Sequence, residues 1–531
     1  MKKPLLLFLS LLILNWGVSA QSIAVSSKET IYKNLQQALE ERDSVYYLDI
    51  SDQGYTEVPE TIGNLINLRK LDLADNRITD LPESLKNLKN LEWLNLSFNS
   101  LSEIPEQLES LKFLKHLYLH HNPIDSLDEG ILILKNLEKL NINSCKLIFV
   151  SYDFKNPKLK ELDLSNNNIV SLPESLTHLN NLEYLNISGN HLTKLPNSMG
   201  DLRSLRRLVC SNNMLIRVPS SIGNLTNLKY LNLNNNNLKD IPESIGKLER
   251  LRELELASNE IEHLPNTLKS LERLALIDLN HNKLERLPEQ IGNLANLLLF
   301  RLSTNNLSSL PESFGNLVNL NALDLSYNKL FKLPDSFSNL RSLKELRLAE
   351  NQLTSLPSNF GELSSLLRLY LSDNLLSQLP ASMENLVYLE LMDLNKNQIE
   401  IFPEVIGSMN KLRDLYLSGN KISTLQHVGK AYSLVAVLLA NNQINNIPES
   451  IGNLRNLRVL DLQHNQIEVL PESIGNLKAL YRIDLSNNKI SSLPASITQL
   501  KFLRGLDLSS TDVTEKEKET LRKTLTKCEI R

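Results

Sequence analysis

The chain has 531 residues, a formal net charge of −4 at neutral pH and only 5% aromatic residues. This mildly acidic balance gives no reason to expect nucleic acid or an anionic membrane surface as a partner. A chain of this length would ordinarily fold as several domains. One pattern repeats along nearly all of it, however, and a single solenoid can absorb the whole length.

The first twenty residues, MKKPLLLFLSLLILNWGVSA, have the pattern of a secretory signal peptide. Lys2 and Lys3 form a basic start, residues 5–14 an apolar stretch, and residues 18–20 a small-residue cleavage site. The apolar stretch is short for a membrane span. We therefore expect cleavage after residue 20, and the loss of two lysines then changes the net charge from −4 to −6. The mature chain is expected to be secreted or periplasmic, with no stable membrane insertion.

Residues 21–45 are predicted to form an N-terminal capping helix. Ser26 and Glu29 fit a capping box, in which each side chain satisfies a backbone N–H of the first helical turn. Four apolar residues follow at helical spacing and are expected to face inward: Ile31, Leu35, Ala38 and Leu39. This helix would cover the first layer of the solenoid.

Residues 46–511 repeat one unit about 21 times. The phrase Leu-x-x-Leu-x-Leu-x-x-Asn ends each unit, and the step between successive Asn residues is 23, except for two steps of 22, from Cys145 to Asn167 and from Asn420 to Asn442. Degenerate units end at Gln53 and Thr511. The regular closing residues are Asn76, Asn99, Asn122, Asn167, Asn190, Asn213, Asn236, Asn259, Asn282, Asn305, Asn328, Asn351, Asn374, Asn397, Asn420, Asn442, Asn465 and Asn488.

Within each unit, residues such as Leu460-Asp461-Leu462 alternate between apolar and polar, which is the periodicity of a strand. The Leu-Pro pair that follows suits the start of a helical turn, because proline lacks an N–H that would have no partner there. Ile474 and Leu477 have helical spacing, and Gly475 is expected to end the turn with a positive φ. Each unit is therefore predicted to contain a short strand, an Asn bend and a one-turn helical or 3₁₀ return.

The Asn side chain has two donors and an acceptor, so it can satisfy backbone groups of its own bend and of the neighbouring unit. Stacked units are expected to align these amides in a buried ladder. Cys145 and Thr511 replace the Asn and are expected to mark irregular units. The three cysteines, Cys145, Cys210 and Cys528, lie in different repeats. We expect buried thiols rather than a metal or catalytic site.

Residues 512–531 are predicted to form a C-terminal capping helix. Thr514 and Glu517 fit a second capping box, and Leu521 and Leu525 are expected to face inward.

The units resemble leucine-rich repeats of the L-x-x-L-P-x-x-I-G-N-L subtype, which Ras-suppressor-like proteins, intracellular plant relatives and many bacterial proteins share. The resemblance covers residues 48 to about 508. It implies an α/β repeat solenoid, a right-handed horseshoe with a concave parallel β-sheet and short helical or 3₁₀ turns on the convex side. It also implies protein recognition as the usual task. The leading signal and the absence of Cys-rich end caps indicate a bacterial exported protein.

The strand residues that point outward on the concave face are free to vary. Between the two strand leucines they are mostly Asp and Asn. We expect these acids to be solvated, with no reason for a shifted pKa.

Two groups of residues depart from this composition. Each is a candidate partner-binding site, and ordinary variation of surface residues is the alternative explanation for each. The first group is Trp93, His116, Tyr118 and His120, with Phe98 and His121 at the bend, where their role can equally be structural. The second group is Arg347, Arg368, Tyr370, Leu391 and Tyr416, with Glu345, Glu350 and Asp414 around it.

No catalytic constellation or cofactor motif is present in the sequence. His116 and His120 would lie roughly 13 Å apart on a strand, without a good third ligand, which argues against zinc. The sequence therefore favours a non-enzymatic, monomeric protein-binding scaffold that recognises a protein on its concave face. A glycan-binding or adhesin-like module is the alternative, and a hydrolase that uses the Asp column is a third possibility.

Overall fold

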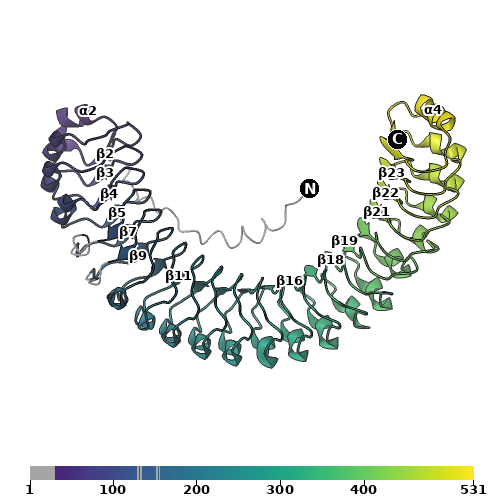
Figure 1. The fold of residues 1–531 in the computed structure, drawn as a ribbon, viewed down its shortest axis with the longest axis horizontal. Helices are drawn as coiled ribbons and strands as arrows, with labels where there is room; N and C mark the ends of the chain where they lie inside the picture. Colours follow the sequence, from purple (N-terminus) through teal and green to yellow (C-terminus); the bar gives the residue numbers. More distant parts are fainter. Residues whose placement is uncertain (1–29, 128–130, 132–133, 151–153, 155) are drawn as a thin grey trace. The chain divides into compact units, whose positions relative to one another are not determined.

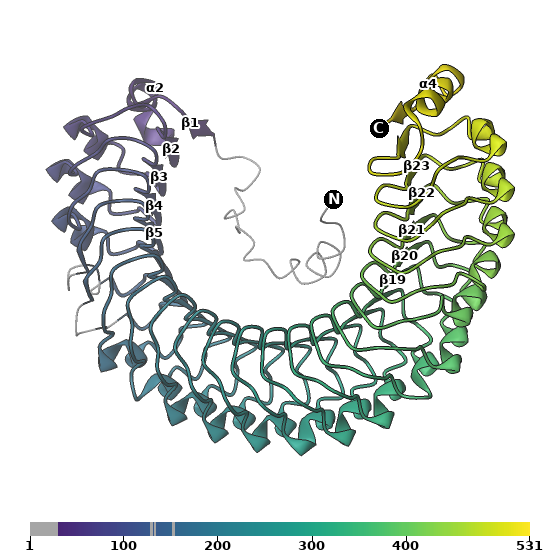
Figure 2. The same ribbon diagram turned by 45° about the vertical axis from the view of Figure 1, so that its right-hand side comes forward.

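The computed structural model describes residues 30–127, 131, 134–150, 154 and 156–531. They form two compact units, one up to Ile169 and one from Val170 onward. Each unit is a repeat solenoid, as predicted, with parallel strands on the inner side of its curve and 3₁₀ helices on the outer side (Figures 1 and 2). The predicted signal peptide and the Ser26–Glu29 capping box lie outside the described residues. No helix in the described residues is long and apolar enough to cross a membrane.

The first unit has one parallel sheet in chain order, in which each strand pairs with the strand of the next coil. Its strands are β1 (Ile31–Tyr32), β2 (Tyr47–Asp49), β3 (Lys70–Asp72), β4 (Trp93–Asn95), β5 (His116–Tyr118), β7 (Lys139–Asn141) and β9 (Glu161–Asp163). A separate pair consists of β6 (Ser126–Leu127) and β8 (Phe149–Val150). The helices are α2 (Leu35–Glu40) and the 3₁₀ helices η2 (Arg42–Ser44), η3 (Glu60–Asn64), η4 (Glu83–Asn87) and η5 (Glu106–Ser110).

The second unit repeats the same arrangement of parallel strands. Its strands are β10 (Tyr184–Asn186), β11 (Arg207–Val209), β12 (Tyr230–Asn232), β13 (Glu253–Glu255), β14 (Leu276–Asp278), β15 (Leu299–Arg301), β16 (Ala322–Asp324), β17 (Glu345–Arg347), β18 (Arg368–Tyr370), β19 (Leu391–Asp393), β20 (Asp414–Tyr416), β21 (Ala436–Leu438), β22 (Val459–Asp461), β23 (Arg482–Asp484), β24 (Gly505–Asp507) and β25 (Glu529–Ile530).

The outer side of the second unit carries short 3₁₀ helices and one terminal α-helix. They are η6 (Glu174–His178), η7 (Met199–Asp201), η8 (Ser220–Asn224), η9 (Glu243–Lys247), η10 (Asn266–Ser270), η11 (Glu289–Asn293), η12 (Glu312–Asn316), η13 (Asp335–Asn339), η14 (Phe360–Glu362), η15 (Ala381–Asn385), η16 (Glu404–Ser408), η17 (Val428–Lys430), η18 (Glu449–Asn453), η19 (Glu472–Asn476), η20 (Ala495–Gln499) and α4 (Glu515–Thr524).

The predicted Asn ladder is present, and Asn351 shows its geometry. The side-chain Oδ1 accepts a hydrogen bond from the Leu330 N–H of the preceding coil at 3.0 Å. The side-chain Nδ2 donates to the carbonyls of Leu325 at 2.9 Å and Leu348 at 3.1 Å. Since Asn351 is only 8% exposed, water does not compete for these groups. One amide therefore joins two coils and closes its own bend.

A second, exposed row of Asn side chains lies just before the strands and was not predicted. Asn90 donates to the carbonyl of Ile66 at 3.0 Å, and Asn319 donates to that of Ala295 at 2.8 Å. Both side chains are accessible to water. These bonds add to the stacking of coils, but solvent can replace them.

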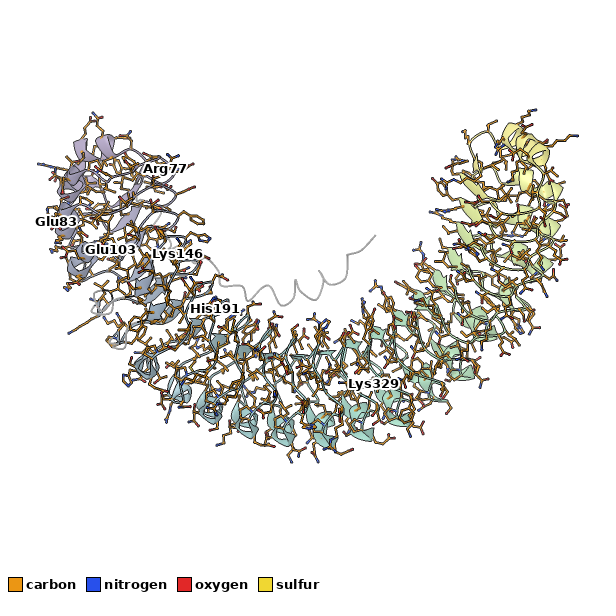
Figure 3. The ribbon with its side chains drawn as sticks, viewed as in Figure 1. Arg77, Glu83, Glu103, Lys146, His191 and Lys329 are labelled. Carbon is orange, nitrogen blue, oxygen red and sulfur yellow. The ribbon has the colours of Figure 1, made fainter. Side chains whose placement is uncertain are left out.

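The expected positive φ of Gly475 is wrong. The positive-φ position lies instead immediately before the ladder Asn, where Asn235, Gly419 and Asn487 are examples. At Gly475 an added Cβ would lie 2.6 Å from both the carbonyl oxygen and the Cβ of Ser496 in the next coil. Glycine is required there because two 3₁₀ returns approach closely. Charged side chains such as Glu83 of η4 project from the returns, and Figure 3 shows Glu83 on the outer side of the first unit.

The N-terminal cap differs from the prediction. The helix is only α2, and its N-cap is Asn34, whose side chain accepts a hydrogen bond from the Gln37 N–H at 3.0 Å. Leu35 and Ala38 are buried, as expected. Ile31 instead lies in the extended strand β1 and is 42% exposed, because the chain pairs there with β2 rather than continuing the helix.

The C-terminal capping helix is α4. Thr514 caps it by accepting from the Glu517 N–H, and Leu521 and Leu525 are buried. The Glu517 carboxylate does not return to the helix start. It accepts from the Leu493 N–H of an earlier coil at 2.9 Å. The cap is thereby attached to the solenoid, and the chain ends in β25, a strand that the sequence did not predict.

The cysteines only partly match the expectation of buried thiols. Cys210 is fully buried, and burial raises its pKa far above the usual range. Cys145 and Cys528 are partly exposed, and burial also raises the pKa of each thiol, to about 11 for Cys528. In the irregular coil after Cys145, Phe154 is buried. Phe149, in β8, is instead 43% exposed.

Candidate functional site

The first candidate group forms a continuous row of aromatic rings across the inner face of the first unit. Its members are Tyr47, Trp93, Phe98, Tyr118, His120 and His121, which we call the aromatic strip. The ring centroids of Trp93 and Tyr118 are 5.6 Å apart. Phe98 stacks on His121 at 4.1 Å and meets His120 edge-on at 5.4 Å. Rings at these separations form one rigid amphipathic surface.

Tyr47 is a member that sequence reasoning missed. Its ring lies 6.5 Å from Trp93, and Lys70 lies between the two in the sheet. The signal was available, because Tyr47 occupies the same strand position as Trp93 two coils earlier. It was overlooked because the first coil ends in Gln53 instead of Asn.

His116 lies beside Trp93 in the sheet, and Lys139 is its neighbour on the other side. The Lys139 Nζ lies 5.7 Å from the centre of the Tyr118 ring and 2.7 Å from the Glu161 carboxylate. The strip therefore has a paired cation, Lys139, at one edge and a second cation, Lys70, whose Nζ lies 5.7 Å from the centre of the Tyr47 ring. Its ring surfaces remain partly exposed.

Phe98 sits in a strained backbone conformation. Its φ is +54°, at the bend position that Asn or Gly occupies in coils such as those of Asn235 and Gly419. A bulky side chain in this region costs about 1 kcal/mol or more. Phe98 is nevertheless 47% exposed, so it gains little burial in return. His281, Tyr327 and His464 occupy the same bend position in other coils, so the strain itself is not special to Phe98. Its exposed ring next to other exposed rings is what supports a binding role for the strip.

Burial lowers the pKa of His116 and of His120. For His120 the neighbouring His121 lowers the pKa further, while Asp163 opposes the shift. The Nδ1 atom of His120 is buried without a hydrogen-bond partner among the described residues. Both rings are therefore held neutral near pH 7, which adds to the apolar character of the strip. No cluster of His, Cys, Asp and Glu suited to a metal ion occurs in the described ranges.

The second candidate group is brought together only in part. Two guanidinium groups share the Glu345 carboxylate, with Arg347 at 2.6 Å and Arg368 at 3.6 Å. Arg347 also lies over the Tyr370 ring, 4.7 Å from its centre. Leu391 pairs with Arg368 in the sheet. These residues form one contiguous surface.

Tyr416 is separated from Tyr370 by Asp393, which lies between them in the sheet. Glu350 lies at the positive-φ bend position, as Phe98 and His121 do in the first unit, and therefore not on the strand itself. The second group therefore consists of a contiguous part on β17–β19 and Tyr416 two strands beyond Tyr370.

The expectation that the inner-face acids are solvated is wrong for several of them. Burial raises the pKa of Asp72, Glu255 and Asp393. Glu255 accepts hydrogen bonds from the Tyr230 hydroxyl at 2.9 Å and from Asn232 at 2.7 Å. Side chains from adjacent strands, about 4.8 Å away, cover each carboxylate on both sides. The lateral neighbours are distant in sequence, which is why the composition of a single repeat did not reveal this burial.

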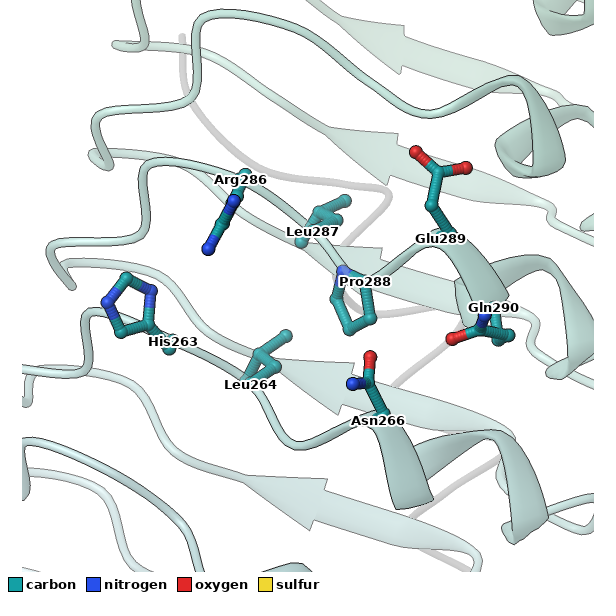
Figure 4. Close-up of a pocket in the computed structure, with 8 residues that line it drawn as sticks. All are labelled: His263, Leu264, Asn266, Arg286, Leu287, Pro288, Glu289 and Gln290. Carbon is teal, nitrogen blue, oxygen red and sulfur yellow. The ribbon is translucent and has the colours of Figure 1, made fainter.

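The second unit also has two surface grooves. One, of 380 Å³, lies between successive coils and is lined by polar side chains, including His263, Asn266, Arg286 and Gln290. Figure 4 shows Arg286 pointing toward His263 across its open side. These residues do not form a recognisable catalytic arrangement. The other groove, of 520 Å³, is lined by Lys411, Arg413 and Arg458 among others.

Comparison with protein families gives matches along most of the chain. The family described as "Leucine-rich repeat region" matches residues 151–229, 217–300, 289–374 and 417–527. The families "Leucine rich repeat" and "Leucine Rich repeats (2 copies)" match residues 43–101 and 89–130. No curated protein matches the chain significantly.

Solved structures give three informative likenesses. A leucine-rich repeat protein of Leptospira interrogans is 30% identical over 94% of this chain and 99% of that chain, with a TM-score of 0.50. The plant peptide hormone receptor RGFR1, in complex with RGF2, is 25% identical over 94% and 88% of the two chains, with a TM-score of 0.72. The Arabidopsis receptor kinase HAESA, in complex with the peptide hormone IDA and the co-receptor SERK1, is 30% identical over 87% and 82%, with a TM-score of 0.65.

Proposed function

Because the chain belongs to the leucine-rich repeat family, we propose that it is a non-enzymatic binding protein that recognises a partner protein on the inner, sheet-lined face of its coils. The observation that carries this proposal is the aromatic strip, in which a partly exposed Trp93 lies on strand β4 and an exposed Phe98 lies at the bend that follows it. Trp, Tyr and Arg are the residues that dominate binding energy at protein interfaces. The plant receptors with the same fold were solved with peptide hormones bound, which supports a protein or peptide ligand.

The signal-like first twenty residues support a role outside the cytoplasm of a bacterial cell. The likeness to a Leptospira protein agrees with a bacterial source. Mass spectrometry of the N-terminus of the protein recovered from its own cells tests this part of the proposal. A mature chain that begins after residue 20 supports export, whereas a retained leader in a cytoplasmic fraction contradicts it.

Truncation of the inner-face aromatic residues is expected to weaken binding of a partner captured from bacterial or host extracts. Trp93→Ala or Tyr370→Ala should raise the Kd about 30-fold, which corresponds to roughly 2 kcal/mol for a hot-spot side chain. The Kd is measured by calorimetry on purified variants. Phe113→Ala and Tyr432→Ala are matched controls, because these aromatic side chains are 58% and 57% exposed outside the strands. Unchanged affinity in both inner-face variants would show that the partner binds elsewhere.

Glycan binding is the second candidate, and the aromatic strip specifically favours it. Asp72, Asn95 and Asn141 lie on the same face as the rings and offer hydrogen-bonding groups beside them. Aromatic faces flanked by amides and carboxylates also suit a sugar. A glycan array probed with the wild-type chain and with Trp93→Ala separates the two candidates. Sugar binding that Trp93→Ala abolishes favours the glycan, whereas an array without signal leaves the protein partner.

A further inference from the structure

Asp414, the first residue of β20, is an acid without a partner on the inner face of the second unit. Its side chain is only partly exposed, and among the described residues no hydrogen bond or ion pair reaches its carboxylate. Arg413 is the one charged group that acts on it, from a distance beyond an ion pair, and burial raises the pKa of the Asp414 carboxyl. Its lateral neighbours in the sheet are Leu391 and Ala436.

The position of an acid within its strand explains why Asp414 lacks a partner. Aspartates at the third strand position accept a hydrogen bond from the backbone two residues later, as Asp461 does from Gln463 at 3.1 Å. An acid at the first position has no such donor and needs a basic neighbour. Glu345 has Arg347 and Arg368. Asp414 has none.

The surroundings of Asp414 are apolar. On the inner face, β19 to β22 carry a partly exposed apolar surface, which we call the shelf. It is made of Leu391, Tyr416, Ala436, Leu438 and Val459. Tyr416 lies two residues from Asp414 on the same face, and Leu438 pairs with Tyr416 in the sheet. A partly buried carboxylate without a counter-charge costs free energy that the fold does not recover. A cation from outside would recover it.

We propose that this shelf binds an extended peptide segment of the partner protein through a lysine or arginine side chain that pairs with Asp414. The inference rests on the proposed function, because it names the chemistry of the segment that the inner face recognises. The aliphatic part of the basic side chain would cover Leu391 and Ala436, as long cationic side chains do on apolar surfaces. The Tyr416 ring would contribute a cation–π contact.

The neighbouring strands extend this specificity to a second charge. Arg368, Leu391 and Asp414 occupy the same position on three consecutive strands, so Arg368 and Asp414 are about 10 Å apart at the usual strand spacing. Arg347 holds the Glu345 carboxylate at 2.6 Å, whereas Arg368 reaches it only at 3.6 Å, so the Arg368 guanidinium can pair with a carboxylate from outside. In a polyproline II segment, residues three positions apart lie on one side and are about 9.3 Å apart. The bound segment is therefore expected to carry an acidic residue and a basic residue three positions apart.

The test is selection from a phage-displayed library of random linear peptides on the immobilised mature chain. The selected peptides should be enriched in lysine or arginine three positions from an acidic residue. Asp414→Asn should weaken their binding about tenfold or more, as expected for a charge-assisted hydrogen bond. Glu253→Gln is the matched control, because Glu253 is also a first-position acid whose pKa burial raises, but it lies on β13 beside Tyr230 and Leu276. Its affinity for these peptides should stay unchanged.

Each outcome has a distinct meaning. If the selected peptides bind wild type and Asp414→Asn equally, or lack basic residues, this inference is wrong. If the same peptides no longer bind Tyr370→Ala, the proposed function still holds. Failure to enrich any peptide above an unrelated immobilised protein counts against both. Thermal unfolding of Asp414→Asn serves as the folding control. Its unfolding midpoint should equal or exceed that of wild type, because the substitution removes an unpaired charge.

Discussion

Replacing Asn351 with alanine should lower the free energy of unfolding by about 3–5 kcal/mol. The substitution removes the acceptor of the Leu330 N–H and the donor to the carbonyls of Leu325 and Leu348. These backbone groups are buried behind the ladder, so no water takes the place of the amide, and each unsatisfied group costs about 1–3 kcal/mol. Urea unfolding followed by far-ultraviolet circular dichroism measures the change.

Asn319→Ala is the matched control for the ladder. Asn319 also donates to a backbone carbonyl of the preceding coil, that of Ala295, but its side chain is exposed. Water can satisfy that carbonyl after the substitution, so the loss should stay below about 1 kcal/mol. Equal losses for the two variants would mean that burial of the ladder is not what makes it stabilising.

Gly475→Ala should also destabilise the chain, by about 1–3 kcal/mol, as overpacking does. The added methyl group would lie 2.6 Å from the Ser496 carbonyl oxygen, so the 3₁₀ returns of two coils would have to separate. Backbone cannot move away as a flexible side chain can. The same chemical denaturation series measures the effect.

Gly505→Ala provides the contrast, since Gly505 lies in β24 and its nearest neighbour to an added Cβ is the Arg482 side chain at 3.6 Å. Alanine fits there, and it restricts the unfolded chain, so stability should stay the same or rise by about 0.4–1 kcal/mol. A destabilised Gly505→Ala together with an unaffected Gly475→Ala would contradict the close-approach explanation.

The fold could be predicted almost fully from the sequence, because the same pattern of apolar residues and Asn recurs in nearly every coil. Each coil must match the next, so the spacing of Leu and Asn fixes strands, bends and returns with little ambiguity. Ile31 and Gly475 are exceptions. Ile31 was assigned to a helix because its spacing fits one, but pairing with β2 offers its backbone more hydrogen bonds. Gly475 was explained by a positive φ, but glycine occurs there because the next coil lies against it, which the local sequence cannot reveal.

The candidate site was harder to predict than the fold. The sequence identified Trp93 and Tyr118 from their rarity and position, and the structure places their rings together. It did not identify Tyr47, nor the burial of Glu255, because both depend on side chains of neighbouring coils that single-repeat composition does not describe. It grouped Tyr416 with Arg347 by residue type, whereas the sheet separates them. Which side chains are neighbours on the inner face is determined by how the strands of successive coils pair.

The inner face of such a solenoid suits recognition because its scaffold is rigid where its surface is variable. The leucines and asparagines that hold the coils together point inward or lie in the ladder. The first and third strand residues and the bend residues are free of that task. Phe98, at a bend, and Asp414, on a strand, show that some of these side chains are retained at a cost to stability. Side chains that are costly in the free protein are expected where a partner recovers the loss.

Hydroxyl-radical footprinting of the chain with and without its captured partner tests the central claim most directly. If the inner face binds the partner, oxidation should decrease at Trp93 and Tyr118, at Tyr370 and Tyr416, or at both pairs. Oxidation of Phe113, Tyr432, Tyr481 and Phe502, which are exposed outside the strands, should stay unchanged. Protection confined to those four residues, with the inner-face rings oxidised as in the free chain, would contradict the account.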